Sequence, residues 1–162
     1  MIERCHKEKL KDKYPTYYGI CRVSDEWLNF QNFAEWYENN YYGIPNESCQ
    51  LDKDIIKRGN QVYCPEYCMF VPQSINLLFA RKKRFRGELP CGVTKKKNGY
   101  MVQIGYNHIV ENLGIYPTIE TAFMAYKQRK EEMVKESAEK YKYILPERVY
   151  EALYKWEAYI DD

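Results

Sequence analysis

The sequence predicts an α+β protein: a small ββα unit with a preceding amphipathic helix, followed by a three-stranded antiparallel sheet packed on a long helix. Three observations predict this class. Apolar residues recur at helical spacing over residues 25–42, strand-like alternation recurs over residues 91–113, and helical spacing returns after Thr118.

The amphipathic helix is predicted over residues 25–42. Ser24 and Asp25 are candidate N-cap residues at its start, and Gly43 follows it as a helix breaker. Its apolar positions are mainly aromatic: Trp27, Phe30, Phe33, Ala34, Tyr37 and Tyr41. Residues 17–23, just before the helix, are compatible with a short strand.

The ββα unit is predicted between Leu51 and Phe79. Residues 51–56 and 61–63 are expected to form two short strands around the Gly59-Asn60 turn. A helical piece then begins at Val71-Pro72 and runs to Phe79.

The C-terminal half is predicted to begin with a three-stranded antiparallel sheet. Its strands are expected at residues 91–94, 100–105 and 108–113. In the second strand Tyr100, Val102 and Ile104 share one face, which the long helix after Thr118 is expected to cover. The helix residues expected in this contact are Ala122, Phe123 and Tyr126, and a final short helix is lined by Val149, Leu153 and Trp156.

Charge is unevenly distributed along a chain whose formal net charge is only +2. Between Arg81 and Lys97, eight basic residues stand against one acid, Glu88. The eight are Arg81, Lys82, Lys83, Arg84, Arg86, Lys95, Lys96 and Lys97. A basic block with acids held elsewhere is typical of a phosphate-binding surface, and the alternative is a solvated linker. We expect residues 81–90 to link two domains, 1–80 and 91–162.

Six cysteines raise the question of the redox compartment. Because no export signal and no membrane-spanning apolar run is recognised, we expect a cytoplasmic protein with free thiols and no membrane partner. A zinc site through Cys64, Cys68 and Cys49 is the alternative, which a lone C-x3-C pair supports only weakly.

Residues 51–76 resemble the core of the HNH homing endonucleases that bacteriophages carry. The resemblance lies in Leu51-Asp52-Lys53-Asp54-Ile55, Gly59-Asn60, the run from Tyr63 to Pro72, and Ile75-Asn76. It implies a ββα-metal unit in which Asp52, Asp54 and Asn76 hold Mg²⁺ or Mn²⁺. It also implies a catalytic set of Asp52, Lys53, Asn60 and Asn76, with Asn60 as the middle Asn of the motif.

Lys53 stands at the position where the family has its general-base histidine. Lysine keeps its proton near neutral pH, above all between Asp52 and Asp54, so it is a poor general base. The motif is therefore degenerate, and three interpretations stay open. The residues form a metal site without useful catalysis, an active variant nuclease or nickase, or ordinary strand-end residues in a binding scaffold.

Residues 92–126 resemble the APETALA/ethylene-response-factor DNA-binding domain, which also occurs behind HNH cores in phage endonucleases. The landmarks are Gly92-Val93, Tyr100 to Ile104, Leu113-Gly114, and Thr121-Ala122-Phe123 with Ala125-Tyr126. The resemblance implies a sheet whose polar face lies in the major groove of duplex DNA. The residues expected to face DNA are Lys95, Lys96, Lys97, Gln103 and Asn112.

These observations favour a phage-type protein that binds duplex DNA, with weak or lost cleavage. The alternative function is a phage inhibitor of a host defence nuclease, in which the degenerate nuclease scaffold binds protein or nucleic acid. The replacement of the base by Lys53 and the 17 tyrosines of the chain motivate this alternative.

Overall fold

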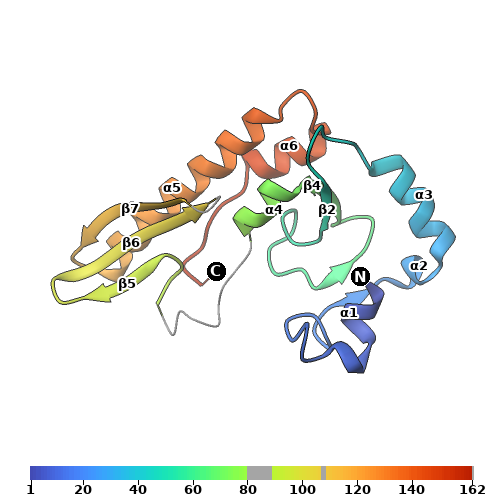
Figure 1. Cartoon of the computed structure of the whole chain (residues 1–162), viewed down its shortest axis with the longest axis horizontal. Coiled ribbons are helices and arrows are strands. Elements are labelled where there is room, and N and C mark those ends of the chain that lie inside the picture. Colours follow the sequence, from blue (N-terminus) through green and yellow to red (C-terminus); the bar gives the residue numbers. More distant parts are fainter. Residues whose placement is uncertain (80–88, 107–108, 162) are drawn as a thin grey trace. The chain divides into compact units, whose positions relative to one another are not determined.

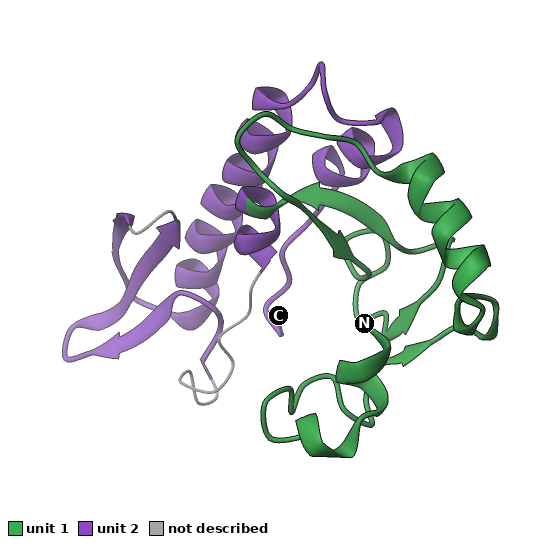
Figure 2. Ribbon diagram, turned by 45° about the vertical axis from the view of Figure 1, so that its right-hand side comes forward, with its two compact units in different colours: residues 1–73 green, residues 74–162 purple. Residues whose placement is uncertain are grey.

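The computed structural model describes residues 1–79, 89–106 and 109–161, and the chain forms two compact units (Figure 1, Figure 2). Unit 1 comprises Met1–Gln73 and unit 2 comprises Ser74–Asp162. The mixed α+β class is confirmed. One group of predicted DNA-binding residues lies outside the described residues: Arg81, Lys82, Lys83, Arg84 and Arg86.

The boundary between the units lies before the 81–90 linker that the sequence suggests. The reason is the packing of α4 (Gln73–Phe79), most of which belongs to unit 2. The Ser74 hydroxyl lies 3.2 Å from the Tyr141 hydroxyl, Lys130 donates to the Leu78 carbonyl, and Phe79 contacts Trp156 edge to face. The predicted ββα unit is therefore not one compact body.

Unit 1 begins with α1 (Ile2–His6) and the 3₁₀ helix η1 (Glu8–Leu10). The single helix predicted at 25–42 is two helices, α2 (Asp25–Leu28) and α3 (Phe30–Asn40). Asn29 separates them because its extended backbone ends α2 while its side chain accepts a hydrogen bond from Gln31 N, which caps α3.

The strands of unit 1 pair differently from the prediction. We expected residues 51–56 to pair with 61–63. Instead, β2 (Cys49–Asp52) pairs antiparallel with β4 (Met69–Pro72), and β1 (Arg22–Val23) pairs in parallel with β3 (Val62–Tyr63). Pro72 ends a strand and does not begin a helix, because residues 69–72 are buried throughout and complete the sheet with β2.

Aromatic side chains build the core of unit 1. Trp27 is almost fully buried, and its ring lies 5.1 Å from Phe33 and 4.7 Å from Trp36. Tyr63 and the thiols of Cys5, Cys21 and Cys68 belong to the same cluster. Of the predicted apolar positions, Trp27 and Phe33 pack in this core, whereas the Phe30 side chain is 71% exposed.

Unit 2 contains the predicted three-stranded antiparallel sheet. Its strands are β5 (Val93–Lys96), β6 (Gly99–Tyr106) and β7 (Ile109–Tyr116), in the spatial order β5-β6-β7. The strand β5 begins after Gly92, whose φ is +74°. A Cβ at this glycine would lie 2.4 Å from the Tyr126 ring, so only glycine fits.

The long helix α5 (Ile119–Lys140) covers one face of this sheet, as predicted (Figure 1). Thr118 caps it through a reciprocal pair of hydrogen bonds with Thr121. The helix buries Ala122, Phe123 and Tyr126, and α6 (Glu147–Tyr154) packs on α5 through Val149 and Leu153. Among the described residues, no helix is long and apolar enough to span a bilayer.

Candidate nucleic-acid interface

The sheet of unit 2 has one covered and one uncovered face. Val93, Val102 and Ile104 point toward α5 and are buried. The opposite face carries the residues that alternate with these positions, and we call it the outer face. Its members are Thr94, Lys96, Met101, Gln103, Gly105, Val110, Asn112 and Ile115.

The three lysines of the β5–β6 hairpin do not all belong to the outer face. The strand β5 reaches Lys96, two residues beyond its predicted end, and side chains alternate along it. Lys96 is opposite Gly99 on the outer face, whereas Lys95 is opposite Tyr100 on the helix side. Lys97 lies in the turn, and all three side chains are exposed. The expectation that these three lysines share one face is therefore wrong for Lys95.

Gln103 and Asn112 lie directly opposite each other on β6 and β7. A β-bulge between Val102 and Gln103 shifts the register here and makes Leu113 the extra residue of β7. Asn112 Oδ1 accepts a hydrogen bond from Gly114 N at 3.1 Å, which leaves its amide nitrogen to donate elsewhere. The two predicted base-reading residues thus form one cross-strand pair of amides.

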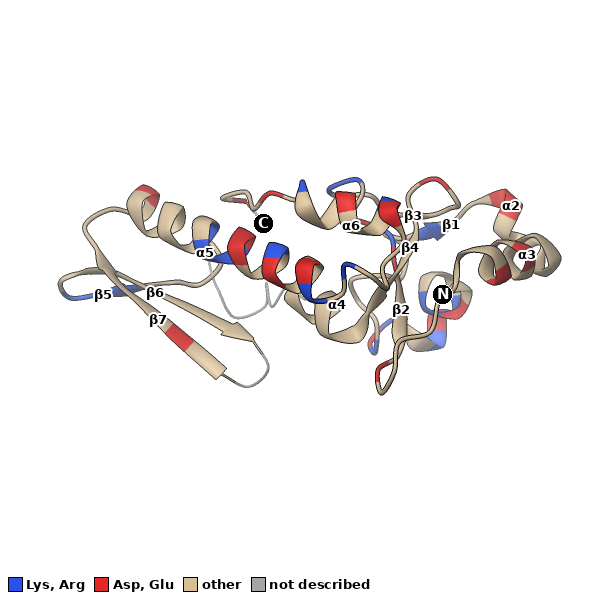
Figure 3. Cartoon of the chain, turned by 90° about the horizontal axis from the view of Figure 1, so that it is seen from above, with Lys and Arg blue, Asp and Glu red and all other residues tan. Residues whose placement is uncertain are grey.

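Negative charge is held on the helix side of the sheet. Glu111, the acidic residue of β7, accepts a hydrogen bond from Arg129 Nε at 2.9 Å, and Arg129 also pairs with Glu136. Figure 3 shows the acids and bases alternating along α5 and the basic hairpin at β5. Lys96 is the charged residue among the outer-face positions of the described strands. The outer face is therefore weakly positive and free of carboxylates in this part of the chain.

Apolar side chains share this face and were not singled out from the sequence. Val110 and Ile115 are exposed by 65% and 56%, and Met101 lies between them and the β5 strand. The alternation of side chains along β7 could have predicted them. With Leu113 taken as a bulge residue, this alternation places Val110 and Ile115 on the outer face. Ile115 was missed because the strand was expected to end at Leu113.

The HNH-like residues of unit 1 form a loop that is closed by its own hydrogen bonds. Asp52 is buried, and its Oδ1 accepts from Asp54 N at 2.9 Å and from Ile55 N at 2.8 Å. Burial, together with the nearby Asp54 charge, raises the pKa of the Asp52 carboxyl to about 6. This carboxyl fixes the turn after β2.

Lys53 and Asn60 hold the two ends of this loop together. Lys53 Nζ donates to Asn60 O at 3.0 Å and to Asp54 Oδ2 at 3.2 Å. Asn60 Nδ2 donates in return to Lys53 O and to Val62 O, and Asn60 Oδ1 accepts from Val62 N. The structure therefore brings Lys53 and Asn60 together, and the hydrogen bonds between them close the loop.

The metal ligands that the HNH resemblance implies come from both units. Asp52 and Asp54 lie in unit 1, whereas Asn76 lies on α4 in unit 2. The Lys53 ammonium is bound to Asp54, and a positive group in that place repels a second cation. Among the described residues, no group of three or more His, Cys, Asp or Glu side chains is arranged to hold a metal. In unit 1, the implied donors are already engaged, Asp52 by two backbone amides and Asp54 by the Lys53 ammonium.

All six cysteines are free thiols. Cys64 and Cys68 are both buried, and burial raises the pKa of each thiol, that of Cys68 to about 12. A protonated, buried thiol is a packing group, since zinc binds the thiolate. Among the described residues, Cys49, Cys64 and Cys68 are not gathered with other ligands into a group that could hold a metal.

The chain matches none of the protein families, curated proteins or solved structures with which it was compared. The fold defines a two-unit α+β protein whose second unit presents one uncovered β-sheet face.

Proposed function

We propose that this protein binds duplex DNA through the outer face of unit 2, without needing to cut it. The observation that supports this most directly is the outer face itself. It is a carboxylate-free strand surface of mixed polar and apolar side chains, with a pair of amides near its centre and a lysine-rich hairpin at its edge. The major groove of B-DNA is wide enough to admit strands of this kind.

The paired amides supply the chemistry of base reading. Asparagine and glutamine side chains offer a donor and an acceptor together, which matches the N6 and N7 positions of adenine. Gln103 and Asn112 lie side by side across two strands, so they are placed to read neighbouring base pairs. We therefore expect a preference for sites that contain adenine.

The hairpin lysines supply contacts to the DNA backbone. Lys96 projects from the outer face, and Lys95 and Lys97 extend from the other side of the strand and from the turn. Because they point in different directions at one edge, they suit phosphates on the walls of a groove better than bases on its floor. These contacts add affinity that weakens with salt.

A fluorescence-anisotropy titration with labelled duplexes tests the proposal. The variants are Lys96→Ala and the triple change of Lys95, Lys96 and Lys97 to Ala. Each lost phosphate contact is expected to lower the slope of log K against log salt by about 0.9. Lys155→Ala is the matched control, because Lys155 is exposed on the α6 side of the same unit and pairs with Glu151. Equal binding by the triple variant and the control contradicts the proposal.

Base reading has its own readout. Gln103→Ala and Asn112→Ala are expected to reduce discrimination between cognate and scrambled duplexes by about 1–3 kcal/mol each, with a smaller effect on non-specific binding. Competition titrations after selection of a preferred duplex measure this difference. Unchanged discrimination in both variants would show that the amide pair does not read bases.

The exposed Val110 and Ile115 favour a second candidate, a protein partner on the same face. In this case the chain is an inhibitor that docks on a host defence nuclease, since exposed apolar side chains beside polar ones are common in protein interfaces. Ile115→Ser separates the two functions. It is expected to weaken a protein complex recovered after nuclease digestion, and to leave the salt slope of DNA binding unchanged.

A further inference from the structure

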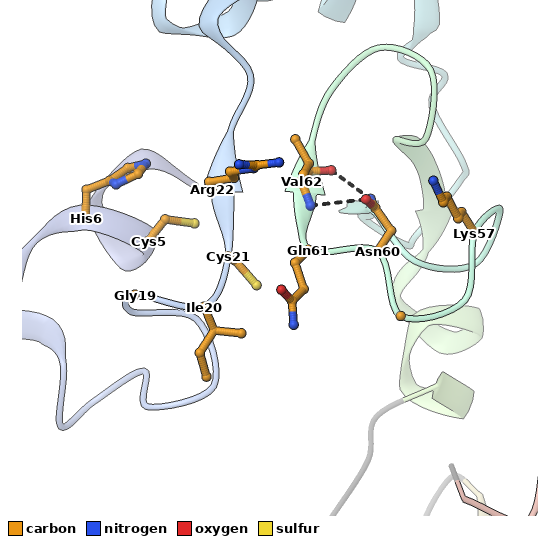
Figure 4. A pocket seen from close by; sticks show the side chains of 11 residues that line it. Cys5, His6, Gly19, Ile20, Cys21, Arg22, Lys57, Asn60, Gln61 and Val62 are labelled. Carbon is orange, nitrogen blue, oxygen red and sulfur yellow. Dashed lines mark hydrogen bonds between the residues drawn. The ribbon is translucent and has the colours of Figure 1, made fainter.

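A second anion site is suggested by a pocket in unit 1, far along the chain from the sheet of unit 2. The pocket has a volume of about 680 Å³ and lies between residues 5–22 on one side and residues 57–62 on the other (Figure 4). Its lining contains His6, Arg22 and Lys57 and contains no carboxylate. We propose that this pocket binds a phosphate group.

The two strong cations of the pocket are Arg22 and Lys57. Within the described part of the chain, Arg22 and Lys57 take part in no ion pair with an Asp or Glu side chain. Lys57 Nζ instead contacts Tyr67, whose hydroxyl lies 3.4 Å away and whose ring lies 4.5 Å below the ammonium. This contact leaves the charge of the ammonium uncancelled, so it can still attract an anion, with the solvent screening expected at an exposed site.

The floor of the pocket adds no negative charge. Cys5 and Cys21 line it and are both buried. Burial raises the pKa of both thiols, and each thiol therefore keeps its proton at neutral pH. A lining that holds Arg22 and Lys57 and no ionised acid favours an anionic ligand.

The far wall of the pocket is rigid before any ligand arrives. Asn60 is buried, and its side chain bonds Lys53 O, Val62 O and Val62 N, which fixes residues 60–62. Arg22 N donates to Gln61 O at 2.9 Å, so β1 and the segment entering β3 hold both walls together. A preformed wall reduces the entropy lost on binding.

The rim of the pocket is open at two glycines. Gly19 and Gly59 both adopt left-handed φ values, +69° and +71°, and a Cβ at either position would meet no atom within 4 Å. This space admits a group larger than a bare phosphate. The ligand class is therefore a phosphate-bearing molecule, either a free nucleotide or the phosphate of a nucleic-acid chain.

The decisive variants are Gly59→Asp and Gly59→Asn in the full chain. Both side chains tolerate left-handed backbone and are similar in size, so the pair differs mainly by one negative charge at the rim. Heteronuclear NMR titrations with inorganic phosphate, a 5′-mononucleotide and the corresponding nucleoside measure binding. We expect Gly59→Asp to weaken phosphate or nucleotide binding about tenfold relative to Gly59→Asn.

Cation removal gives an independent readout. Arg22→Gln with Lys57→Gln is expected to abolish the shifts of the pocket amides, whereas Lys9→Gln with Lys11→Gln, exposed cations outside the pocket, is expected to preserve them. A response to the mononucleotide and to phosphate identifies a free ligand. A response only to oligonucleotides, lost in Gly59→Asp, identifies a backbone phosphate.

Two results would overturn the proposal. One is equal binding by Gly59→Asp, Gly59→Asn and the double Gln variant of Arg22 and Lys57. The other is nucleoside binding as strong as nucleotide binding. Neither depends on the sheet of unit 2, because Lys96→Ala is expected to leave these titrations unchanged while it weakens duplex binding.

Discussion

Glu111 of β7 and Arg129 of α5 form an ion pair at 2.9 Å on the covered side of the sheet. The strand places Asn112, the next residue, on the opposite side. One strand therefore presents its carboxylate to a helix and its neutral amide to solvent, and this division keeps negative charge away from the outer face.

Moving one negative charge across the strand tests this division. Asn112→Asp keeps an oxygen for the hydrogen bond from Gly114 N but adds a carboxylate to the outer face. We expect it to weaken duplex binding about tenfold or more, because a carboxylate facing phosphates is repelled. Glu111→Gln removes a charge from the covered side and costs less than about 1 kcal/mol of stability, since the pair is partly exposed. Equal losses of duplex affinity by Asn112→Asp and Glu111→Gln in anisotropy titrations would contradict the placement of Asn112 on the outer face and Glu111 on the helix side.

Gly92 is predicted to be irreplaceable for packing as well as for its backbone angle. Gly92→Ala brings a Cβ within 2.4 Å of the Tyr126 ring and 2.6 Å of Gln103 O, so we expect a loss of about 3 kcal/mol or more in unfolding free energy. Gly59→Ala has the same sign of φ but open space, and should cost only about 1 kcal/mol. Urea denaturation measures both. Similar losses of unfolding free energy in Gly92→Ala and Gly59→Ala would mean that the Tyr126 ring moves aside at little energetic cost.

The buried carboxyl of Asp52 predicts a pH dependence of stability. Its pKa is raised from 3.8 to about 6, so the folded chain binds the proton more tightly than the unfolded chain does. The contribution of this group to the unfolding free energy therefore falls by on the order of 2–3 kcal/mol as pH rises from about 4 to about 6. Above that range it stays low.

Asp52→Asn isolates this contribution. The Asn oxygen still accepts the bonds from Asp54 N and Ile55 N, and the variant has no carboxyl to ionise. The difference in unfolding free energy between wild type and Asp52→Asn is expected to change across pH 4–6. Asp12→Asn, at an exposed position, is the control. A pH-independent difference for Asp52→Asn would show that this carboxyl is not desolvated.

Cleavage is predicted to be absent. The HNH resemblance aligns Lys53 with that family's general base, and the Lys53 ammonium is engaged by Asn60 O and Asp54. A proton donor held in this way does not activate water, and general-base catalysis is worth about 10²–10⁴-fold. Supercoiled plasmid incubated with Mg²⁺ or Mn²⁺ is expected to stay intact. Nicking by the wild type that Asp52→Asn abolishes would contradict this prediction and restore the nuclease interpretation.

Local pattern explains why the sheet and long helix of unit 2 were predictable. The strands are joined by short connections, so alternation and the Asn98-Gly99 turn specify the β5–β6 pairing within a few residues. The capping pair Thr118 and Thr121 likewise marks the start of α5. The end of β5 was missed by two residues, and this small error reversed the side assigned to Lys95.

The strand pairs of unit 1 were not predictable in the same way. Val62 and Tyr63 pair with Arg22 and Val23, forty residues earlier in the chain, through strands of two residues each. Such short strands carry no periodicity. The pairing of these strands depends on the burial of Val23 and Tyr63 in the same aromatic core. The local sequence around either strand does not predict this pairing.

The sequence by itself determined the α+β class, the order of the elements in unit 2 and the burial of Val102 and Ile104, because these depend on interactions between near neighbours. Tertiary structure alone decided that Asp52, Lys53 and Asn60 close a loop, that α4 belongs mainly to unit 2, and that Arg22 and Lys57 line one pocket. The physical reason is that each of these features depends on contacts between segments that are distant in the sequence. Which segments pack together and exclude water is determined only when the whole chain folds.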